Sequence, residues 1–449
     1  MAPRVNYSDN GRAAASSSPA QAAPPPALAP NGAANSVASP PHSVHDTAPS
    51  ARLSPRLVGV DAARGLAVLG MFVVHVGLGW TLADGSNALY PITAGRAAGL
   101  FAVLAGVSIA LLSGGPQPPS GSAWGVALWR VVLRGLLVLP IGVALTLLDT
   151  PVSVILSYYA VFFVLAVPLL QERWKVVAGA ALVLAVVGPL ASFYLRGMID
   201  DGAALASVVD TVNGVDPLQV FTGEGVVDFL LTGAYPAITW LPFVLAGLAV
   251  GRLDLHRPRV QVGLVAVGVA VAVTAYGVSA LALWAVGGTG RLVGSTNPAT
   301  GQAYTESGVA DALHTGFPGL GLPTSEGAWL LVAAPHSGTP FEVLGVIGVA
   351  LAVLGLCLLV TPYMSWVLYP ITAVGALALT VYVAHVLVIH VADTGALDGT
   401  PLGVISDHLA VSILVGALLL ASLWRGVLRR GPLEWLLHVV SSWGARRIP

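Results

Sequence analysis

The chain has 449 residues, of which 56% are hydrophobic and only 9% are charged, whereas soluble domains average about 25% charged residues. This composition excludes an ordinary water-soluble domain. The 20 basic and 21 acidic side chains nearly balance, so the sequence lacks the basic surplus typical of nucleic-acid-binding proteins. With a single cysteine, Cys357, it predicts no internal disulfide and no Cys-x-x-Cys metal centre.

Composition divides the chain into two parts. Residues 1–52 are rich in Ala, Pro, Ser and Asn, and such a segment buries too little apolar surface to offset its ordering entropy. We therefore predict a disordered cytoplasmic tail. Residues 53–449 hold apolar blocks close to the ~20 residues that span a bilayer as a helix, which predicts an all-α membrane bundle of ten helices. The predicted helices are 61–82, 95–113, 124–148, 152–170, 174–195, 230–251, 260–286, 341–361, 370–391 and 409–428.

The loops between these blocks predict the orientation, because Lys and Arg accumulate on the cytoplasmic side. With both ends inside, the outer loops are acidic and hold only three arginines, Arg96, Arg196 and Arg291. A final amphipathic piece, 432–443, should lie on the membrane surface. Two outer connections, 196–229 and 287–340, are long enough to be lids or binding loops. We expect a multi-pass protein of the cell (plasma) membrane that contacts the lipid bilayer; the sequence leaves its oligomeric state open.

The first predicted helix carries three ionisable residues. Arg64 and His75 are eleven residues apart, which places them on one face of a helix, about 16 Å apart along its axis. Asp61 precedes Arg64 by one turn and can pair with it as an architectural clamp. His75 lies deep in the membrane, where an ionisable residue favours a functional site; the alternative is a neutral histidine bonded to a neighbouring helix.

Other candidate residues lie on later segments. Arg130 and Arg134 share a face of the third helix, where they either anchor it at the cytoplasmic boundary or bind a phosphorylated donor. His385 on the ninth helix lies deep, whereas His390 is interfacial and points away from it, so the two are a poor metal pair. Histidine suits proton transfer.

On the outer side, Arg96 opens the second helix and either holds an anionic substrate group or anchors the interface. His336 precedes the eighth helix, in a loop that could form part of an acceptor site.

Five short segments stand out along the chain, in this order: Asp61-Ala-Ala-Arg64-Gly, Leu100-Phe-Ala-Val-Leu-Ala-Gly106, Ile155-Leu-Ser-Tyr-Tyr159-Ala, Ala378-Leu-Thr380-Val-Tyr382 and Gly431-Pro-Leu-Glu434-Trp435. With these landmarks the sequence resembles the catalytic-domain family of heparan-alpha-glucosaminide N-acetyltransferase and its bacterial YeiB-like relatives. The spacing of Arg64 and His75 is also similar to a motif of the acyltransferase-3 membrane proteins.

The resemblance implies a structural role for Glu434 and transfer of an acyl group, often acetyl from acetyl-CoA, to an extracytoplasmic carbohydrate or lipid-linked acceptor. It does not assign the catalytic residue. The heparan enzymes use a histidine in the outer loop after the first helix, whereas residues 80–92 here hold none.

Two hypotheses follow. In the first, the protein is a transmembrane acyltransferase. Arg64, Arg130 and Arg134 attract the CoA phosphates, and either His75 or His385 acts as general base. We expect these two histidines to line the same cavity. No metal ion is required. In the second, the protein is a transporter or flippase for a small or lipidic solute, since polar residues within the membrane also mark transport pathways. Against transport, the sequence shows no clear internal repeat.

Overall fold

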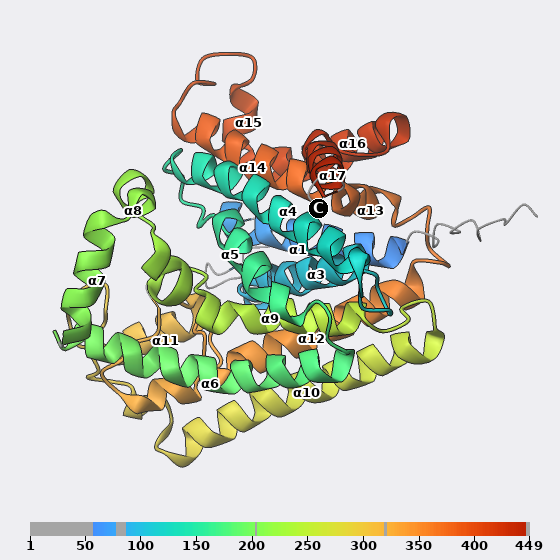
Figure 1. The fold of residues 1–449 in the computed structure, drawn as a ribbon. Coiled ribbons are helices and arrows are strands. Elements are labelled where there is room, and N and C mark those ends of the chain that lie inside the picture. The colour runs from blue at the N-terminus through green and yellow to red at the C-terminus, as the bar shows by residue number, and fades with distance from the viewer. Residues whose placement is uncertain (1–56, 78–86, 203, 318–320, 446–449) are drawn as a thin grey trace, which may run out of the picture. The chain divides into compact units, whose positions relative to one another are not determined.

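The regular elements of the computed structural model are helical throughout the residues that it describes, 57–77, 87–202, 204–317 and 321–445. Within these ranges the strand-like features are isolated bridge residues, of which Thr296 and Ala303 pair with each other. The predicted all-α class is therefore confirmed (Figure 1). The tail predicted at 1–52 lies outside the described residues.

Each of the ten predicted segments contains helix. The matching elements are α1 (Val58–Val76), α2 with α3 (Tyr90–Thr93 and Arg96–Leu112), α4 (Ser122–Thr146), α5 with η1 (Leu156–Ala166 and Val167–Leu169), α6 (Trp174–Asp200), α9 (Ala237–Gly251), α10 (Pro258–Ala285), α12 (Pro340–Val360), α13 with α14 (Tyr369–Ala376 and Ala378–Asp393) and α16 (Leu409–Leu428). The predicted surface piece is α17 (Pro432–Gly444).

Not all ten are long enough to be called spans. In the described part of the chain, seven helices are long and apolar enough to cross a membrane. The pair α13 and α14 would make an eighth, but it bends by 86° at its break. The remaining two, α5 with η1 and α9, are shorter apolar helices. The structure thus supports a polytopic membrane protein, while the count of ten spans and the orientation stay predictions.

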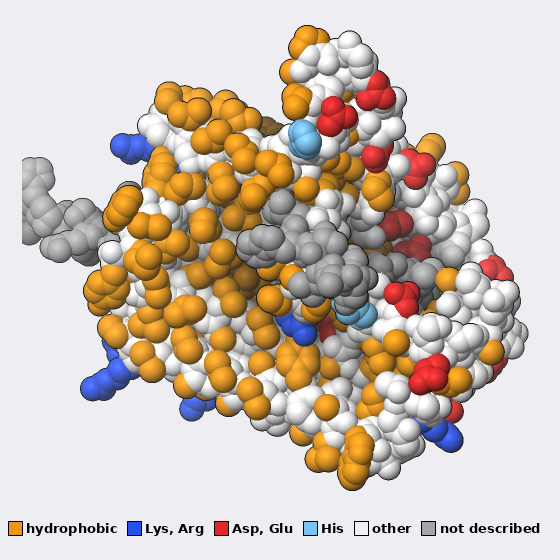
Figure 2. Space-filling model, turned by 180° about the vertical axis from the view of Figure 1, so that it is seen from behind, with side chains coloured by type: hydrophobic (Ala, Val, Ile, Leu, Met, Phe, Trp, Pro, Cys, Tyr) orange, Lys and Arg blue, Asp and Glu red, His pale blue; other side chains and the backbone are white. Residues whose placement is uncertain are grey.

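Charged side chains are distributed unevenly over the described surface. Figure 2 shows hydrophobic side chains over much of one face, with acidic side chains gathered toward one edge and most Lys and Arg toward the other. Elements of the two long predicted outer connections lie at the acidic side. They are α7 (Ala204–Val215), α8 (Pro217–Thr222), η2 (Asp228–Thr232), η3 (Gly288–Arg291), α11 (Glu306–Thr315) and η4 (Gly327–Leu331). The second connection packs around the buried Trp329.

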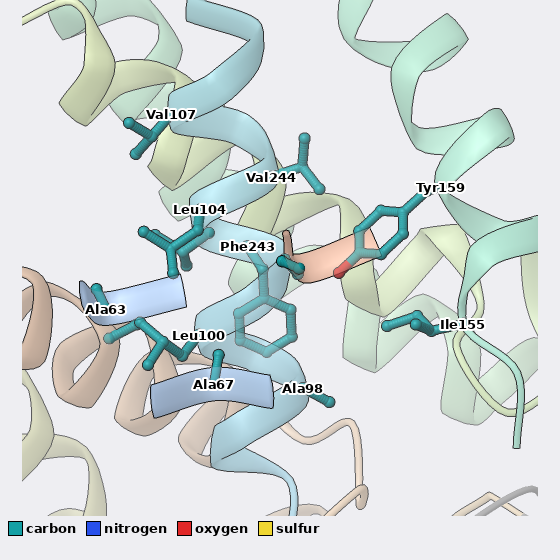
Figure 3. Packing of buried hydrophobic residues seen from close by; sticks show 14 of the residues in the cluster. Ala63, Ala67, Ala98, Leu100, Leu104, Val107, Ile155, Tyr159, Phe243 and Val244 are labelled. Atoms are coloured by element: carbon teal, nitrogen blue, oxygen red, sulfur yellow. The ribbon is translucent and has the colours of Figure 1, made fainter. Parts of the chain in front are cut away.

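Close packing of glycine-bearing helices holds the centre of the bundle. A Cβ on Gly247 of α9 would collide with the carbonyl oxygen of Val103 on α3, so these two helices touch backbone to backbone. A Cβ on Gly375 of α13 would likewise collide with the carbonyl of Asp61 on α1. Small residues permit such contacts between membrane helices. Figure 3 shows the core that results, to which α1, α3, α5 and α9 all contribute.

Candidate functional site

Two histidines from distant helices meet inside the bundle. Nδ1 of His75, near the end of α1, lies 3.0 Å from Nε2 of His385 on α14, and the two rings are stacked with their centroids 5.3 Å apart. Nδ1 of His385 bonds the carbonyl oxygen of Tyr382, one turn earlier on the same helix. The His385 ring also packs on Phe72 of α1.

The partners of this pair assign its tautomers. A carbonyl oxygen can only accept, so Nδ1 of His385 carries a proton and donates it to Tyr382. In the neutral ring Nε2 of His385 is then an acceptor, and Nδ1 of His75 must donate to it. The consequence is that Nε2 of His75 keeps its lone pair. A chain of this kind fixes the tautomer and the orientation of a histidine, so the free nitrogen of His75 is available to accept a proton.

His75 lines a cavity of about 290 Å³, which we call the histidine cavity. Its wall is formed by α1, α2, α3 and α14 and by the segments before α5, α9 and α12, and its polar side chains are Tyr90, Thr93, Ser153, Tyr235, His336 and Tyr382. His385 does not line it. That residue instead lines an apolar groove between α14 and α16. The expectation that both histidines share one cavity is therefore wrong: they touch each other but face different spaces.

His336 reaches the histidine cavity from the loop before α12. Its backbone has a φ of 55°, and its ring stacks on Trp240 and meets Tyr235 edge-on. Desolvation by the surrounding side chains lowers the pKa of His336 to about 4, so the ring is neutral at physiological pH. His336 is thus a second neutral imidazole in the wall of the cavity that His75 lines. Its role on the acceptor side stays a prediction.

Arg96, unlike His336, does not reach the histidine cavity. Its neighbours Gly95 and Ala97 line the histidine cavity, but Arg96 itself does not. The Nε of Arg96 donates to the hydroxyl of Tyr276 on α10 at 3.2 Å, and the guanidinium lies over the same ring. The predicted role in holding an acceptor thus has no support from its position, which fits an anchor between α3 and α10.

A second cavity of about 220 Å³ contains two arginines, and we call it the arginine cavity. Arg64 of α1 donates to Asp61, to the carbonyl of Gly375 and, at 2.9 Å, to the hydroxyl of Ser108. Arg134 of α4 donates from Nε to the hydroxyl of Ser441 on α17 at 3.4 Å. The structure therefore brings Arg64 and Arg134 together.

The electrostatic surroundings of Arg134 are basic. Arg64, Arg130 and Arg430 all lie close enough to repel it. Arg130 adds its charge from outside, because it does not line the cavity. The carboxylate in the wall, Glu434, is engaged elsewhere. Two guanidinium groups that face one space, with further arginines nearby, favour an anionic ligand.

Asp61 and Glu434 lie in structural positions. Asp61 is buried and pairs with Arg64 at 3.2 Å. Glu434 of α17 accepts the backbone N–H groups of Leu379 and Thr380 at 2.8 and 3.1 Å, and the hydroxyl of Thr380 at 2.6 Å. It therefore caps the first turn of α14, whose N–H groups have no partner within the helix, and fixes where the helix carrying His385 begins.

A thin layer of side chains separates the two cavities. Ile155 and Tyr382 line the histidine cavity. Leu156, which directly follows Ile155, and Tyr159 line the arginine cavity. We call these four residues the partition. Figure 3 shows Tyr159 and Ile155 on the same side of the core, facing α3. The hydroxyl of Tyr159 is buried and has no hydrogen-bond partner among the described residues.

Sequence reasoning missed the partition as a functional feature. In the sequence, Tyr159 and Tyr382 stand out only as parts of family landmarks. The available signal was the pair of tyrosines, Tyr158 and Tyr159, in a short apolar segment, where a buried hydroxyl needs a partner.

The fold and the site define a polytopic helical membrane protein with two cavities that meet back to back between its helices. The chain belongs to the membrane acetyltransferase family described as heparan-alpha-glucosaminide N-acetyltransferase, catalytic, which matches residues 56–286. A second family, described as a protein of unknown function (DUF418), matches residues 307–444. Both agree with the resemblance seen in the sequence. No curated protein matches the chain. The described residues hold no group of three or more metal-ligating side chains.

Proposed function

We propose that the protein is a transmembrane acyltransferase of the cell (plasma) membrane. It takes an acyl group, acetyl in the first instance, from a CoA thioester on the cytoplasmic side and passes it to a carbohydrate or lipid-linked acceptor on the other side. The family supports acetyl transfer as the reaction class. The residues that line the arginine cavity and the histidine cavity support separate sites for the donor and the acceptor.

The arginine cavity suits the donor. Arg64 and Arg134 line it, and Arg130 and Arg430 add positive charge nearby, which matches the phosphates of CoA. At about 220 Å³ the cavity is smaller than the ~300–1,000 Å³ of sites that enclose drug-sized ligands. It therefore cannot enclose a whole acyl-CoA. We assign the thioester end to the cavity and the phosphates to its basic surroundings, where Arg130 and Arg430 lie near Arg134.

The observation that carries the proposal is the partition. Consecutive residues, Ile155 and Leu156, line opposite cavities, so a thioester in one cavity and an acceptor in the other are separated by a single layer of side chains. A shift of that layer brings the two reactants together without opening a path for water. Exclusion of water protects a thioester from hydrolysis and strengthens electrostatic interactions at the reacting atoms.

The histidine pair supplies the base. The acceptor oxygen or nitrogen bonds to the acyl carbon while Nε2 of His75 takes its proton. The bond between the acyl carbon and sulfur then breaks, and the proton passes from His75 to the CoA thiolate. His385 does not touch the acceptor in this scheme: it holds the His75 ring and stabilises its charged form through the hydrogen bond to Nδ1.

Tyr159 is placed to assist. Tyr159 lines the arginine cavity, and its buried hydroxyl has no partner in the described structure. In our scheme this hydroxyl donates a hydrogen bond to the acyl carbonyl oxygen as negative charge develops there. Donors of this kind contribute about 10²–10³ in rate.

The test is acetyl-CoA binding and turnover by the purified protein. We expect Arg134→Ala to weaken binding and His75→Ala to abolish turnover while leaving binding intact. Arg257→Ala and His256→Ala are matched controls, because both side chains are exposed and lie in neither cavity. If the wild type neither binds nor consumes acetyl-CoA or longer acyl-CoA thioesters, the proposal is wrong.

One observation favours the alternative of transport. The 86° break between α13 and α14 resembles the discontinuous helices at the substrate sites of transporters. A transporter of this design would move a solute across sealed liposomes without consuming a thioester. Solute flux that persists in His75→Ala, with no thioester turnover in the wild type, would favour this reading over acyl transfer.

A further inference from the structure

The proposed reaction leaves the apolar groove at His385 unexplained, and we call this space the lateral groove. It has a volume of about 390 Å³ and lies between α14 and α16, with Phe72 of α1 also in its wall. Apart from His385, the polar side chains along it are Thr380, Ser412 and Trp424. Two of these are already bonded: Thr380 donates to Glu434, and Trp424 donates to the carbonyl of Arg430.

The position of α16 shows what the groove opens to. Only 11% of the most apolar stretch of this helix is buried, the lowest share of the seven candidate spans. Figure 1 shows α16 at the margin of the described fold, beside α17. In a membrane, the outer face of such a helix meets lipid, so the groove opens sideways toward the hydrocarbon of the bilayer.

A groove in this position does not stay empty or hold water. Water needs two to four polar partners, and most of the polar groups here are engaged. An empty space would deprive the lining side chains of dispersion contacts that a neighbouring chain supplies. The groove extends along α16 from Ser412 to Trp424, twelve residues or about 18 Å at 1.5 Å per residue. That is close to half of the ~30 Å hydrocarbon thickness, the depth of one leaflet.

The two ends of the groove are distinct. At one end Thr380 bonds Glu434, which lines the arginine cavity. The other end, at Ile405 and Ser412, lies beyond His385 and away from the arginines. A lipid whose chain fills the groove therefore passes His385, and with its polar group at the second end it lies on the histidine side of the partition.

We propose that the lateral groove binds one hydrocarbon chain of a membrane lipid, and that this lipid is the acceptor of the acyl group. The groove's apolar lining, its opening to the bilayer and the direct contact of His385 with His75 together carry this inference. The assignment of the lipid as acceptor rests on the proposed acyl transfer, whereas the binding of a lipid chain in the groove does not. A soluble carbohydrate would have no use for a lipid-facing groove whose wall includes His385.

A substitution at Gly416 of α16 can close the groove. It lines the groove, and a Cβ added to it would meet no atom within 4 Å. A bulky side chain there fills the groove without disturbing the helix contacts. Gly277 of α10 is a matched control, because a Cβ there also meets nothing and α10 does not line the groove. Ala384→Leu closes the groove from the opposite wall.

The binding test uses full-length protein in nanodiscs that contain a phospholipid with a photoreactive diazirine in one acyl chain. We expect cross-links on groove residues of α14 and α16 in the wild type and in Gly277→Trp. They should be lost in Gly416→Trp and Ala384→Leu, while cross-links elsewhere persist and show that the variants are folded. Groove cross-links that survive both substitutions, or that are absent from the wild type, would overturn the binding site.

The acceptor test follows labelled acetyl from acetyl-CoA in the same nanodiscs. We expect label in the lipid fraction, reduced about tenfold or more in Gly416→Trp, with unchanged acetyl-CoA affinity. If the wild type consumes acetyl-CoA but leaves the lipid unlabelled, the acceptor assignment is wrong and the acyltransferase proposal stands. If cross-linking succeeds but no thioester is consumed, the proposed function fails and the lipid site remains.

Discussion

His75 and His385 lie 310 residues apart in the chain, yet Nδ1 of one is 3.0 Å from Nε2 of the other. The relationship is directional, because the carbonyl of Tyr382 holds the far side of the His385 ring. It divides the labour between the two histidines: His75 faces the cavity where an acceptor would react, and His385 positions it.

This division predicts different kinetics for the two histidines. His75→Ala should lower kcat by about 10²–10⁴, the range of general base catalysis. His385→Ala should lower kcat by about 10–100, the usual cost of losing an orienting partner, and should leave the KM for the thioester unchanged. His390→Ala, on the same helix but outside both cavities, is the control. A larger loss in His385→Ala than in His75→Ala would reverse the assignment.

Tyr159→Phe tests the partition. The substitution removes one unpartnered hydroxyl and keeps the ring, which packs against Phe101, Phe162 and Phe163. We expect unchanged thermal stability and acetyl-CoA affinity, with a fall in kcat of about 10²–10³. Steady-state kinetics beside a thermal melt measures both. An unchanged kcat would show that the hydroxyl does not meet the reacting carbonyl.

The pH dependence of stability should report His336. Its pKa is about 4 in the folded protein, because burial disfavours the charged ring, and about 6.5 in the unfolded chain. Between pH 6.5 and 4 the unfolded chain binds the extra proton, so stability should fall as pH falls, by about 3 kcal/mol in all. His336→Gln should flatten this part of a stability–pH curve, measured by thermal unfolding in detergent. An equal slope in the variant would assign the effect to other groups.

The packing of α3 on α9 makes a prediction about stability alone. Gly247→Ala should destabilise the protein by more than about 2 kcal/mol, because the added methyl collides with the backbone of α3 and overpacking has few ways to relax. Gly277→Ala, where the methyl meets open space, should be neutral or stabilise by up to about 1 kcal/mol. Similar melting temperatures for both variants would contradict the packing argument.

The cap on α14 can be tested separately. Glu434→Ala removes the acceptor of three hydrogen bonds at the start of the helix and should cost about 1–2 kcal/mol. Glu306→Ala removes an exposed carboxylate from the outer α11 and should cost less. Thermal unfolding measures the difference. Equal losses would mean that Glu434 does not determine where α14 begins.

Hydropathy sufficed to locate the helices, because the backbone N–H and C=O groups of an apolar run in a membrane must bond to each other, as they do in a helix. It could not foresee the break near Leu377, which depends on Glu434 arriving from α17 to cap the new helix. The shared face of Arg64 and His75 followed from helical geometry, but each residue ended in a different cavity, since α3, α5 and α14 fill the space between them.

Residue spacing also failed to predict which residues line a cavity where a contact with another helix determines the position of the side chain. Arg96 was a candidate for the acceptor site because it begins a helix on the outer side, but Tyr276 on α10 holds its guanidinium. Arg130 and Arg134 share a helical face as expected, yet Arg134 alone lines the cavity. A sequence gives the face of a helix on which a residue lies; which helix covers that face is a tertiary property.

The central claim is that an acyl group passes from the arginine cavity to the histidine cavity. The most direct measurement uses sealed proteoliposomes of known orientation, with labelled acetyl-CoA on one face only. We predict labelled lipid, and free CoA thiol, only when the thioester is on the face nearer to Arg134. Turnover only when the thioester is on the His75 face would contradict the account.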